Sequence, residues 1–260
     1  MKTLADIVVS AMDLCGVGVL ALGRSMRTHT TAKHNIKRVN RFLGNEEVEG
    51  VAIACGLFDA FAPKYGRVVV LADWTDVVNG KMLVFALPCN GRSVPFFTKV
   101  VAKHAGEGGL IRAENEALQI LKRICATRSD VIIVADRGFG NQRWLGAVRE
   151  HGFHFVQRLS CVFYAETEHH IGGLKELNVR RGKPIRDWGH GTIGEDEAIV
   201  GRLVTAYDKK AKEPWYLVTD LDEATAHEVV SIYRRRYLQD SRHQPVTHRL
   251  PLHKKQGIPA

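Results

Sequence analysis

The stretch VIIVAD, Val131–Asp136, joins an apolar run to an aspartate, and VVVLAD, Val68–Asp73, has the same design earlier in the chain. A continuous β-branched run bounded by polar residues predicts a strand buried on both faces, as in sheets covered by helices. An acid at the end of such a strand lies at the rim of the sheet, where α/β proteins build their sites. Two neighbouring strand ends would bring Asp73 and Asp136 together, and carboxylates that close need a cation such as a hard divalent metal. The alternative interpretation is that each aspartate only caps its strand or the following turn.

The composition is that of a globular protein with a basic charge balance. The 260 residues include 37 Lys and Arg against 28 Asp and Glu, which gives a net charge of +9. An excess of this size favours a polyanionic partner. The five cysteines are far apart and form no CxxC pair, so we expect reduced, mostly buried thiols of a cytosolic protein rather than disulfides or a zinc knuckle.

The N-terminal region combines apolar and basic segments. Residues 4–22 are fairly apolar, but Asp6 and Asp13 interrupt them, which favours an amphipathic helix over a membrane span or a signal peptide. Residues 24–45 carry no acid and have apolar residues at helical spacing, so they predict a helix with one apolar and one basic face. That basic face is either a solvated surface or a surface that lies along phosphates. Its cations are Arg24, Arg27, Lys33, Lys37, Arg38 and Arg41.

Three short strands follow, joined by Asn79-Gly80 and Asn90-Gly91, and Asn-Gly is a strong hairpin signal. A helix, the strand that ends at Asp136, a second helix and a further strand come next. This order is that of a ribonuclease-H-like core, a mixed five-stranded sheet with helices, in which strands one and four lie side by side. The expected ranges are Val68–Ala72, Met82–Leu87, Ser93–Thr98, Glu114–Thr127, Val131–Ala135, Asn141–His151 and Phe153–Leu159.

The rest of the chain changes in character at residue 160. Several glycines separate short strand-like pieces up to residue 214, which predicts a β-rich insertion. A strand at Trp215–Thr219 and an arginine-dense helix at Glu223–Gln239 complete the core. The predicted regions are a basic helical region (1–66), the core (67–159), the insertion (160–214), the end of the core with its last helix (215–240) and an irregular tail (241–260).

With these elements placed, the chain resembles the DDE transposases of the insertion-sequence-four (IS-four) family over nearly its whole length. The resemblance rests on the order and spacing of the motifs together rather than on any single motif. The matching segments are TTAKH at 30–34, RFLGN at 41–45, LADWTD at 71–76, GRSVP at 91–95, ADRGF at 135–139 and YRRR at 233–236.

The resemblance implies a site of three acids on two Mg²⁺ (or Mn²⁺) ions. Asp73 and Asp136 match the first two catalytic blocks, and Asp240 falls where the family has a Glu, four residues after the motif arginine. The Lys expected seven residues after that acid falls at Thr247. Residues 241–260 no longer resemble the family, as in a truncated or frame-altered copy, so the match weakens at its third acid.

The function so implied is metal-dependent DNA cleavage and strand transfer in DNA transposition, by a cytoplasmic, nucleoid-associated protein that dimerises on transposon ends and target DNA and has no membrane partner. Two alternatives stay open: a catalytically inactive DNA-binding remnant, and a ribonuclease-H-like nuclease. The residues expected to contact DNA are Tyr233, Arg236, Arg137, Lys33, Lys37, Arg38 and Arg41.

Several other residues are also considered as candidate ligands or DNA contacts. Asp76, three residues after Asp73, is an alternative first metal ligand. Trp74 either packs beside the site or stacks on a flipped base. The histidine pairs 169–170 and 151 with 154 have no accompanying Cys or Asp ligand set, so they indicate surface or structural histidines rather than zinc.

Overall fold

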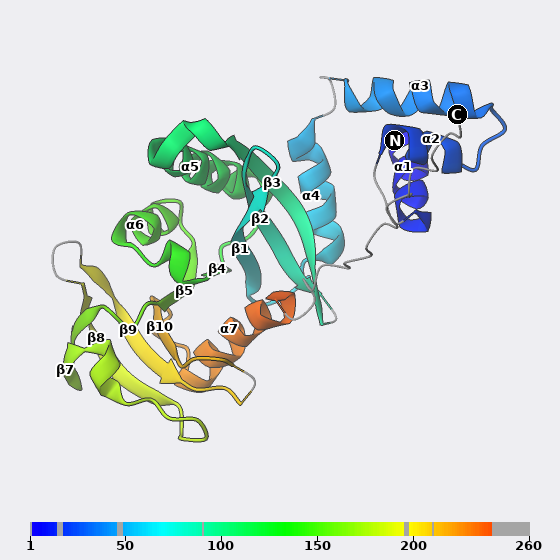
Figure 1. Ribbon diagram of the computed structural model, residues 1–260. Helices are drawn as coiled ribbons and strands as arrows, with labels where there is room; N and C mark the ends of the chain where they lie inside the picture. Colours follow the sequence, from blue (N-terminus) through cyan, green and yellow to red (C-terminus); the bar gives the residue numbers. More distant parts are fainter. Residues whose placement is uncertain are drawn as a thin grey trace, which may run out of the picture. The chain divides into compact units, whose positions relative to one another are not determined.

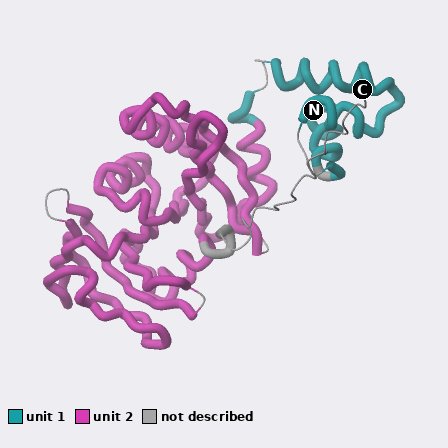
Figure 2. Tube along the Cα trace, in the orientation of Figure 1, with its two compact units in different colours: residues 1–52 teal, residues 53–260 magenta. Residues whose placement is uncertain are grey.

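The computed structural model of the protein describes residues 2–14, 18–45, 49–89, 91–194, 198–209 and 211–240, except for the side chains of residues 12 and 237–240. The chain divides into two compact units, residues 1–52 and residues 53–260 (Figure 2). Among the described residues, no helix combines the length and the apolar character needed to cross a membrane.

The first unit is helical, and its core is small. The core is formed by Ile7 of α1, Leu22 of α2, Met26 at the C-terminal end of α2, and Val39 of α3. Helix α3 lies inside the segment predicted to be helical, with Val39 buried and Lys33, Lys37 and Arg41 exposed. The helices that begin in this unit are α1 (Lys2–Asp13), α2 (Val19–Ser25), α3 (Ala32–Leu43) and α4 (Gly50–Phe61), of which α4 continues into the second unit.

The second unit is built on a mixed sheet whose strand order is β3-β2-β1-β4-β5-β10-β9-β8-β6-β7 (Figure 1). Strands β1, β4 and β5 pair in parallel, and β2 and β3 continue from β1 in antiparallel fashion. The prediction that strands one and four lie side by side is therefore confirmed. The first five strands are β1 (Val68–Val77), β2 (Gly80–Cys89), β3 (Arg92–Ala102), β4 (Val131–Ala135) and β5 (His154–Leu159).

The sheet has more strands than the five that were predicted. Strand β10 pairs with β5 on one side and with β9 on the other, so the β-rich segment extends the core sheet to ten strands. The sequence pattern identified this segment as β-rich but carried no signal for which strand it would join. Its strands are β6 (Tyr164–Thr167), β7 (His170–Gly173), β8 (Arg186–Ile193) and β9 (Ile199–Ala206), followed by β10 (Trp215–Thr219).

Strand β1 is longer than its apolar run. Its parallel pairing with β4 ends at Ala72↔Ala135, but pairing with β2 continues to Val77↔Gly80. Asp73 therefore lies within the strand rather than at its end. The predicted hairpin at Asn79-Gly80 is confirmed, with Asn79 at φ 67°, while Asn90 of the second turn lies outside the described residues.

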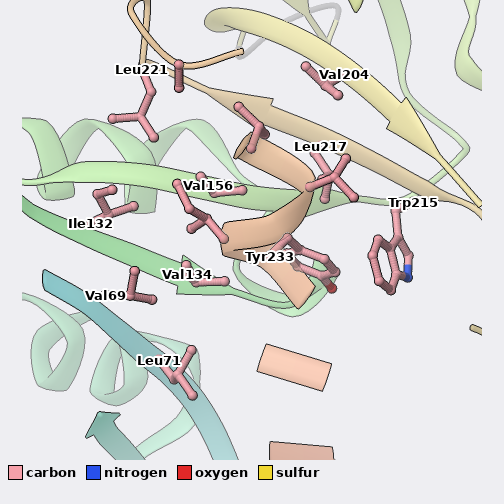
Figure 3. Packing of buried hydrophobic residues seen from close by; sticks show 14 of the residues in the cluster. Val69, Leu71, Ile132, Val134, Val156, Val204, Trp215, Leu217, Leu221 and Tyr233 are labelled. Carbon is pink, nitrogen blue, oxygen red and sulfur yellow. The ribbon is translucent and has the colours of Figure 1, made fainter. Parts of the chain in front are cut away.

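Helices cover both faces of the sheet. Val69 and Leu71 of β1, Val134 of β4 and Val156 of β5 pack on the α7 side, together with Tyr233 of that helix (Figure 3). Because side chains alternate along a strand, Val70 and Ile133 point to the other side, where Figure 1 shows α5 and α6. These helices are α5 (Gly106–Ile124), α6 (Gln142–Glu150) and α7 (Ala226–Asp240), with 3₁₀ turns η1 (Lys103–Ala105), η2 (Arg137–Phe139) and η3 (Leu174–Leu177).

The described cysteines form no disulfide. Cys125 is buried, and burial raises the pKa of its thiol to about 12. Cys55 and Cys89 are half-buried and Cys161 is exposed, so the prediction of mostly buried thiols is correct only for Cys125. Cys15 lies outside the described residues.

Candidate active site at the end of the parallel strands

Asp73 and Asp136 each follow the last residue of the parallel pairing between β1 and β4. Ala72 pairs with Ala135, so the two aspartates are the next residues at the same edge of that ladder. Val69, Leu71 and Asp73 alternate onto one face, and so do Val134 and Asp136, and this face is the one that α7 covers. The sheet register thus brings together what we call the carboxylate pair, Asp73 and Asp136.

Helix α7 contributes two side chains to the carboxylate pair. Arg236 Nη2 lies 3.2 Å from Asp73 Oδ1 and 3.6 Å from Asp136 Oδ2. One helical turn earlier, the Tyr233 hydroxyl lies 3.5 Å from Asp136 Oδ1, at the long limit for a hydrogen bond. Tyr233 is held by edge-on packing against Trp215, with ring centroids 4.9 Å apart. The fold therefore brings Tyr233 to Asp136 across 97 residues of sequence and Arg236 to Asp73 across 163 residues.

The phenol of Tyr233 stays protonated at neutral pH. Burial raises its pKa most, and the negative charge of Asp136 raises it further, so the ordinary value of 10.0 is a lower limit. A neutral hydroxyl donates its proton to an acceptor, whereas a phenolate would be repelled by the neighbouring carboxylate.

Asp136 caps the turn that follows its strand and also belongs to the carboxylate pair. Its Oδ1 atom accepts a hydrogen bond of 2.8 Å from the Arg137 backbone N–H and so caps the turn η2. The Gln157 side-chain amide donates to the Asp136 backbone carbonyl at 2.6 Å. These bonds hold the aspartate in place while its carboxylate faces Arg236.

Two residues of this site were not predicted from the sequence. Arg158 of β5 has its Nη1 atom 3.6 Å from Asp136 Oδ1, and its Nη2 atom 3.1 Å from Glu213 Oε2. Glu213 also pairs with Arg137, whose guanidinium is 3.2 Å away. A signal for Arg158 was present, since it follows Val156 by two residues and so lies on the same face of the sheet as the carboxylate pair. Glu213, in the connection before β10, had no such signal.

The carboxylate pair fits a shared cation. One nitrogen of Arg236 is within ion-pair distance of both acids, so their oxygens converge on a common position. Carboxylate oxygens are the protein ligands that Mg²⁺ and Mn²⁺ prefer. No group of three or more His, Cys, Asp or Glu gathers among the described residues. Asp240 is the last residue of α7, one turn after Arg236, and its side chain lies outside the described part of the structure.

The predicted DNA-contacting cations of α3 differ in their surroundings. Lys33, Lys37 and Arg41 are exposed at intervals of four residues, which puts them in one row along the helix. Arg38 is half-buried and bound to α1, with its Nη2 atom 2.7 Å from Asp6 Oδ2 and 3.1 Å from the Thr3 hydroxyl. Arg38 thus also ties two helices of its unit together.

The alternative site residues lie apart from the carboxylate pair or have other partners. Asp76 is an odd number of residues from Asp73 in the same strand, so it projects from the opposite face of the sheet. Trp74 Nε1 donates a hydrogen bond of 3.1 Å to Glu114 Oε1, which supports a packing role. His154 Nδ1 lies 3.4 Å from Asp220 Oδ2, and no metal-ligand group forms around it among the described residues.

Comparison with known families gives one match. A family model described as "Transposase DDE domain" matches residues 94–238, more than half of the chain. Asp136, Tyr233 and Arg236 fall inside this range, whereas Asp73 precedes it and Asp240 follows it. A search of the curated proteins finds no match.

Proposed function

Because the chain belongs to the family of transposases with a DDE domain, we propose that it catalyses metal-dependent cleavage and strand transfer of DNA in the transposition of an insertion sequence. The observation that carries the proposal is the carboxylate pair. Asp73 and Asp136, from parallel strands, are brought to one cationic nitrogen, at 3.2 and 3.6 Å. Two carboxylates that share a cation form the centre that phosphoryl transfer on DNA requires.

In this proposal Asp73 and Asp136 would hold two Mg²⁺ or Mn²⁺ ions, and Asp240 would complete the ligand set from α7. When bound, the ions supply an activated nucleophile and neutralise charge on the scissile phosphate. In the first reaction, a water oxygen bonds to phosphorus and the bond to the 3′ oxygen breaks, which leaves a 3′-hydroxyl. In the second reaction, the oxygen of that hydroxyl bonds to a phosphorus of the target DNA, and the bond from that phosphorus to its own 3′ oxygen breaks, which leaves a 3′-hydroxyl on the target strand.

The cations around the carboxylate pair bind the DNA backbone. Arg236 and Arg137 carry guanidinium groups, which suit bidentate contact with phosphate oxygens. The neutral Tyr233 hydroxyl donates to a phosphate or to the adjacent carboxylate. Lys33, Lys37, Arg38 and Arg41 of α3 add affinity that does not depend on base sequence.

We further propose that the protein belongs to the IS-four branch of this family and has a ribonuclease-H-like core, a proposal that the motifs at residues 71–76, 135–139 and 233–236 support. Its substrates are transposon ends and target DNA, so its site of action is the cytoplasm at the nucleoid. We propose a homodimer in the DNA complex, since two ends are joined in one reaction.

A strand-transfer assay tests the proposed function. The purified protein is incubated with Mg²⁺, a labelled duplex from the DNA that flanks its coding sequence, and a supercoiled target plasmid. The expected result is a covalent product in which the labelled 3′ end is joined to the plasmid, and which is absent when EDTA is added.

The same assay separates the alternatives. A nuclease would cut the labelled duplex without joining it to the plasmid. An inactive remnant would shift the duplex in a gel without cutting it. Either result would overturn the proposed function.

A further inference from the structure

The guanidinium of Arg236 lies between the two acids of the carboxylate pair and is more deeply buried than either. Its side chain is 7% exposed, whereas those of Asp73 and Asp136 are 26% and 32% exposed. Its Nη2 atom approaches both carboxylates, so one positive charge neutralises much of the repulsion between them.

A metal ion shared by Asp73 and Asp136 needs the oxygens that Arg236 contacts. Carboxylate ligands bind Mg²⁺ at about 2.0–2.1 Å, so an ion held by both acids would compete with the guanidinium for these oxygens. The guanidinium and such an ion cannot both occupy that position, because the ion would bind the same carboxylate oxygens at a shorter distance than Arg236 does. We propose that Arg236 is a resident counter-ion of the carboxylate pair, which competes with the divalent metal and leaves the pair when the metal binds. This inference rests on the proposed function.

The contacts of Asp136 suit such an exchange. Its Oδ1 atom meets the Arg137 backbone N–H, the Arg158 guanidinium and the Tyr233 hydroxyl, at 2.8, 3.6 and 3.5 Å. Its Oδ2 atom is the one that faces Arg236. Departure of Arg236 therefore leaves the Oδ1 contacts in place, and the carboxylate keeps its orientation.

A DNA phosphate is the anion that this site receives in the proposed function, and the displaced guanidinium can pair with it. Binding energies of two ligands that act on one element are coupled reciprocally. A phosphate that pairs with Arg236 removes the competitor of the metal, and a bound metal frees Arg236 for phosphate. We therefore expect DNA and divalent metal to bind this protein cooperatively, through Arg236.

Manganese titration of the full chain, followed by electron paramagnetic resonance of free Mn²⁺, tests the inference without catalysis. Arg236→Gln removes the competing charge and should bind Mn²⁺ about tenfold more tightly than the wild type, within the roughly 5–150-fold range usual for coupled sites. Arg235→Gln is the matched control, since Arg235 is an exposed neighbour on α7 and carries the same charge. It should leave the Mn²⁺ affinity close to that of the wild type.

A second arm adds a short duplex of arbitrary sequence. The duplex should tighten Mn²⁺ binding to the wild type and to the Arg235→Gln protein, and much less to the Arg236→Gln protein. Arg236→Lys, which keeps the charge and most of the side-chain length, should resemble the wild type. Arg236→Met, which also removes the charge, takes the place of the Gln variant if that one does not fold, and it should bind Mn²⁺ more tightly in the same way.

The outcomes separate this inference from the proposed function. If Arg236→Gln binds Mn²⁺ no more tightly than the wild type, while Asp73→Asn and Asp136→Asn abolish binding, the counter-ion role is wrong and the metal site stands. If binding survives both Asn variants, the ions are held elsewhere and both proposals fail. If the duplex tightens binding equally in the Arg236→Gln protein, the coupling does not run through this residue.

Discussion

At the residue scale, the environment of each acid determines its role more than its residue type does. The carboxylate of Asp136 contacts a backbone N–H, the Tyr233 hydroxyl and the Arg236 guanidinium. Asp73 contacts the same guanidinium. Glu114 is instead half-buried and hydrogen-bonded to Trp74, with its Oε2 atom 3.9 Å from an Arg143 nitrogen. Its pKa is raised because the cost of burial outweighs the Trp74 hydrogen bond and the attraction of Arg143.

Glu114→Gln should therefore stabilise the protein increasingly as pH rises. A raised folded-state pKa means that the stability from protonated Glu114 is present below the unfolded value of 4.5 and is lost as pH rises through the folded value. Gln stays neutral and still accepts the Trp74 hydrogen bond. The difference in Tm, variant minus wild type, should grow from about pH 4 to about pH 7 in thermal scans.

Glu116→Gln, on the same helix, is the control of opposite sign. Its hydrogen bond with Lys99 lowers the pKa of Glu116, so the stability from ionised Glu116 is present above 4.5 and lost as pH falls. That variant should lose stability relative to the wild type at neutral pH. Parallel pH trends for the two variants would contradict these assignments.

The residues of the candidate site were partly predictable. Asp73, Asp136, Tyr233 and Arg236 were recognised from motifs, and the fold brings these four together. Arg158 was missed, although alternation from Val156 would have placed it on the correct face. The sequence gives no means of placing Glu213, because its position depends on the strand beside which β10 lies.

At the element scale, α7 has a well-formed start. The Thr225 hydroxyl accepts from the Glu228 backbone N–H at 3.2 Å, and the Glu228 carboxylate accepts from the Thr225 backbone N–H at 2.7 Å. This reciprocal arrangement is a capping box. It fixes the first turn of the helix that carries Tyr233 and Arg236.

Thr225→Ala should destabilise the protein by about 0.5–2 kcal/mol, the usual cost of losing an N-cap side chain. Urea unfolding measures this, and Thr225→Ser, which keeps the hydroxyl, should recover most of the loss. The hydrogen bonds from Thr225 lower the pKa of Glu228, so this stability is present above 4.5 and lost as pH falls through the folded value. An Ala variant as stable as the Ser variant would show that the cap contributes nothing.

Element types were easier to predict than element ends. The helix predicted at Glu114–Thr127 begins eight residues earlier, at Gly106, because glycines there obscured the helical pattern. Strand β1 continues past its apolar run because β2 supplies hydrogen bonds after β4 has ended. The end of β1 is thus set by a tertiary contact, which the local sequence does not encode.

At the scale of the whole molecule, the net charge of +9 is consistent with binding to a polyanion. Lys33, Lys37 and Arg41 form an exposed row on α3, while Arg38 must give up its pairing with Asp6 before it can contact phosphate. We expect the row to supply more of the salt-dependent affinity than Arg38 does.

Lys37→Ala and Arg41→Ala should each weaken duplex binding and reduce the slope of log affinity against log salt by about 0.9 per lost phosphate contact. Fluorescence anisotropy at several salt concentrations measures this slope. Arg38→Ala is the comparison, with a smaller change of slope expected. A slope unchanged in both row variants would remove α3 from the DNA-binding surface.

The ten-stranded sheet was the large-scale feature that the sequence did not reveal. Strand order within the core followed from hairpin signals and from the alternation of strands and helices. The side-by-side pairing of β10 with both β5 and β9 is a long-range choice that no local pattern specifies. This pairing also fixes the position of Glu213 beside Arg158 and Arg137.

The central claim is that Asp73 and Asp136 together form the metal-dependent cleavage centre. Its most direct test is the Mg²⁺-dependent nicking of DNA that contains the flanks of the coding sequence, by the wild type and by Asp73→Asn, Asp136→Asn and Asp76→Asn proteins. We predict that nicking is lost in the first two variants and retained in the third, whose side chain lies on the opposite face of the sheet. Nicking that survives both Asp73→Asn and Asp136→Asn would contradict the account.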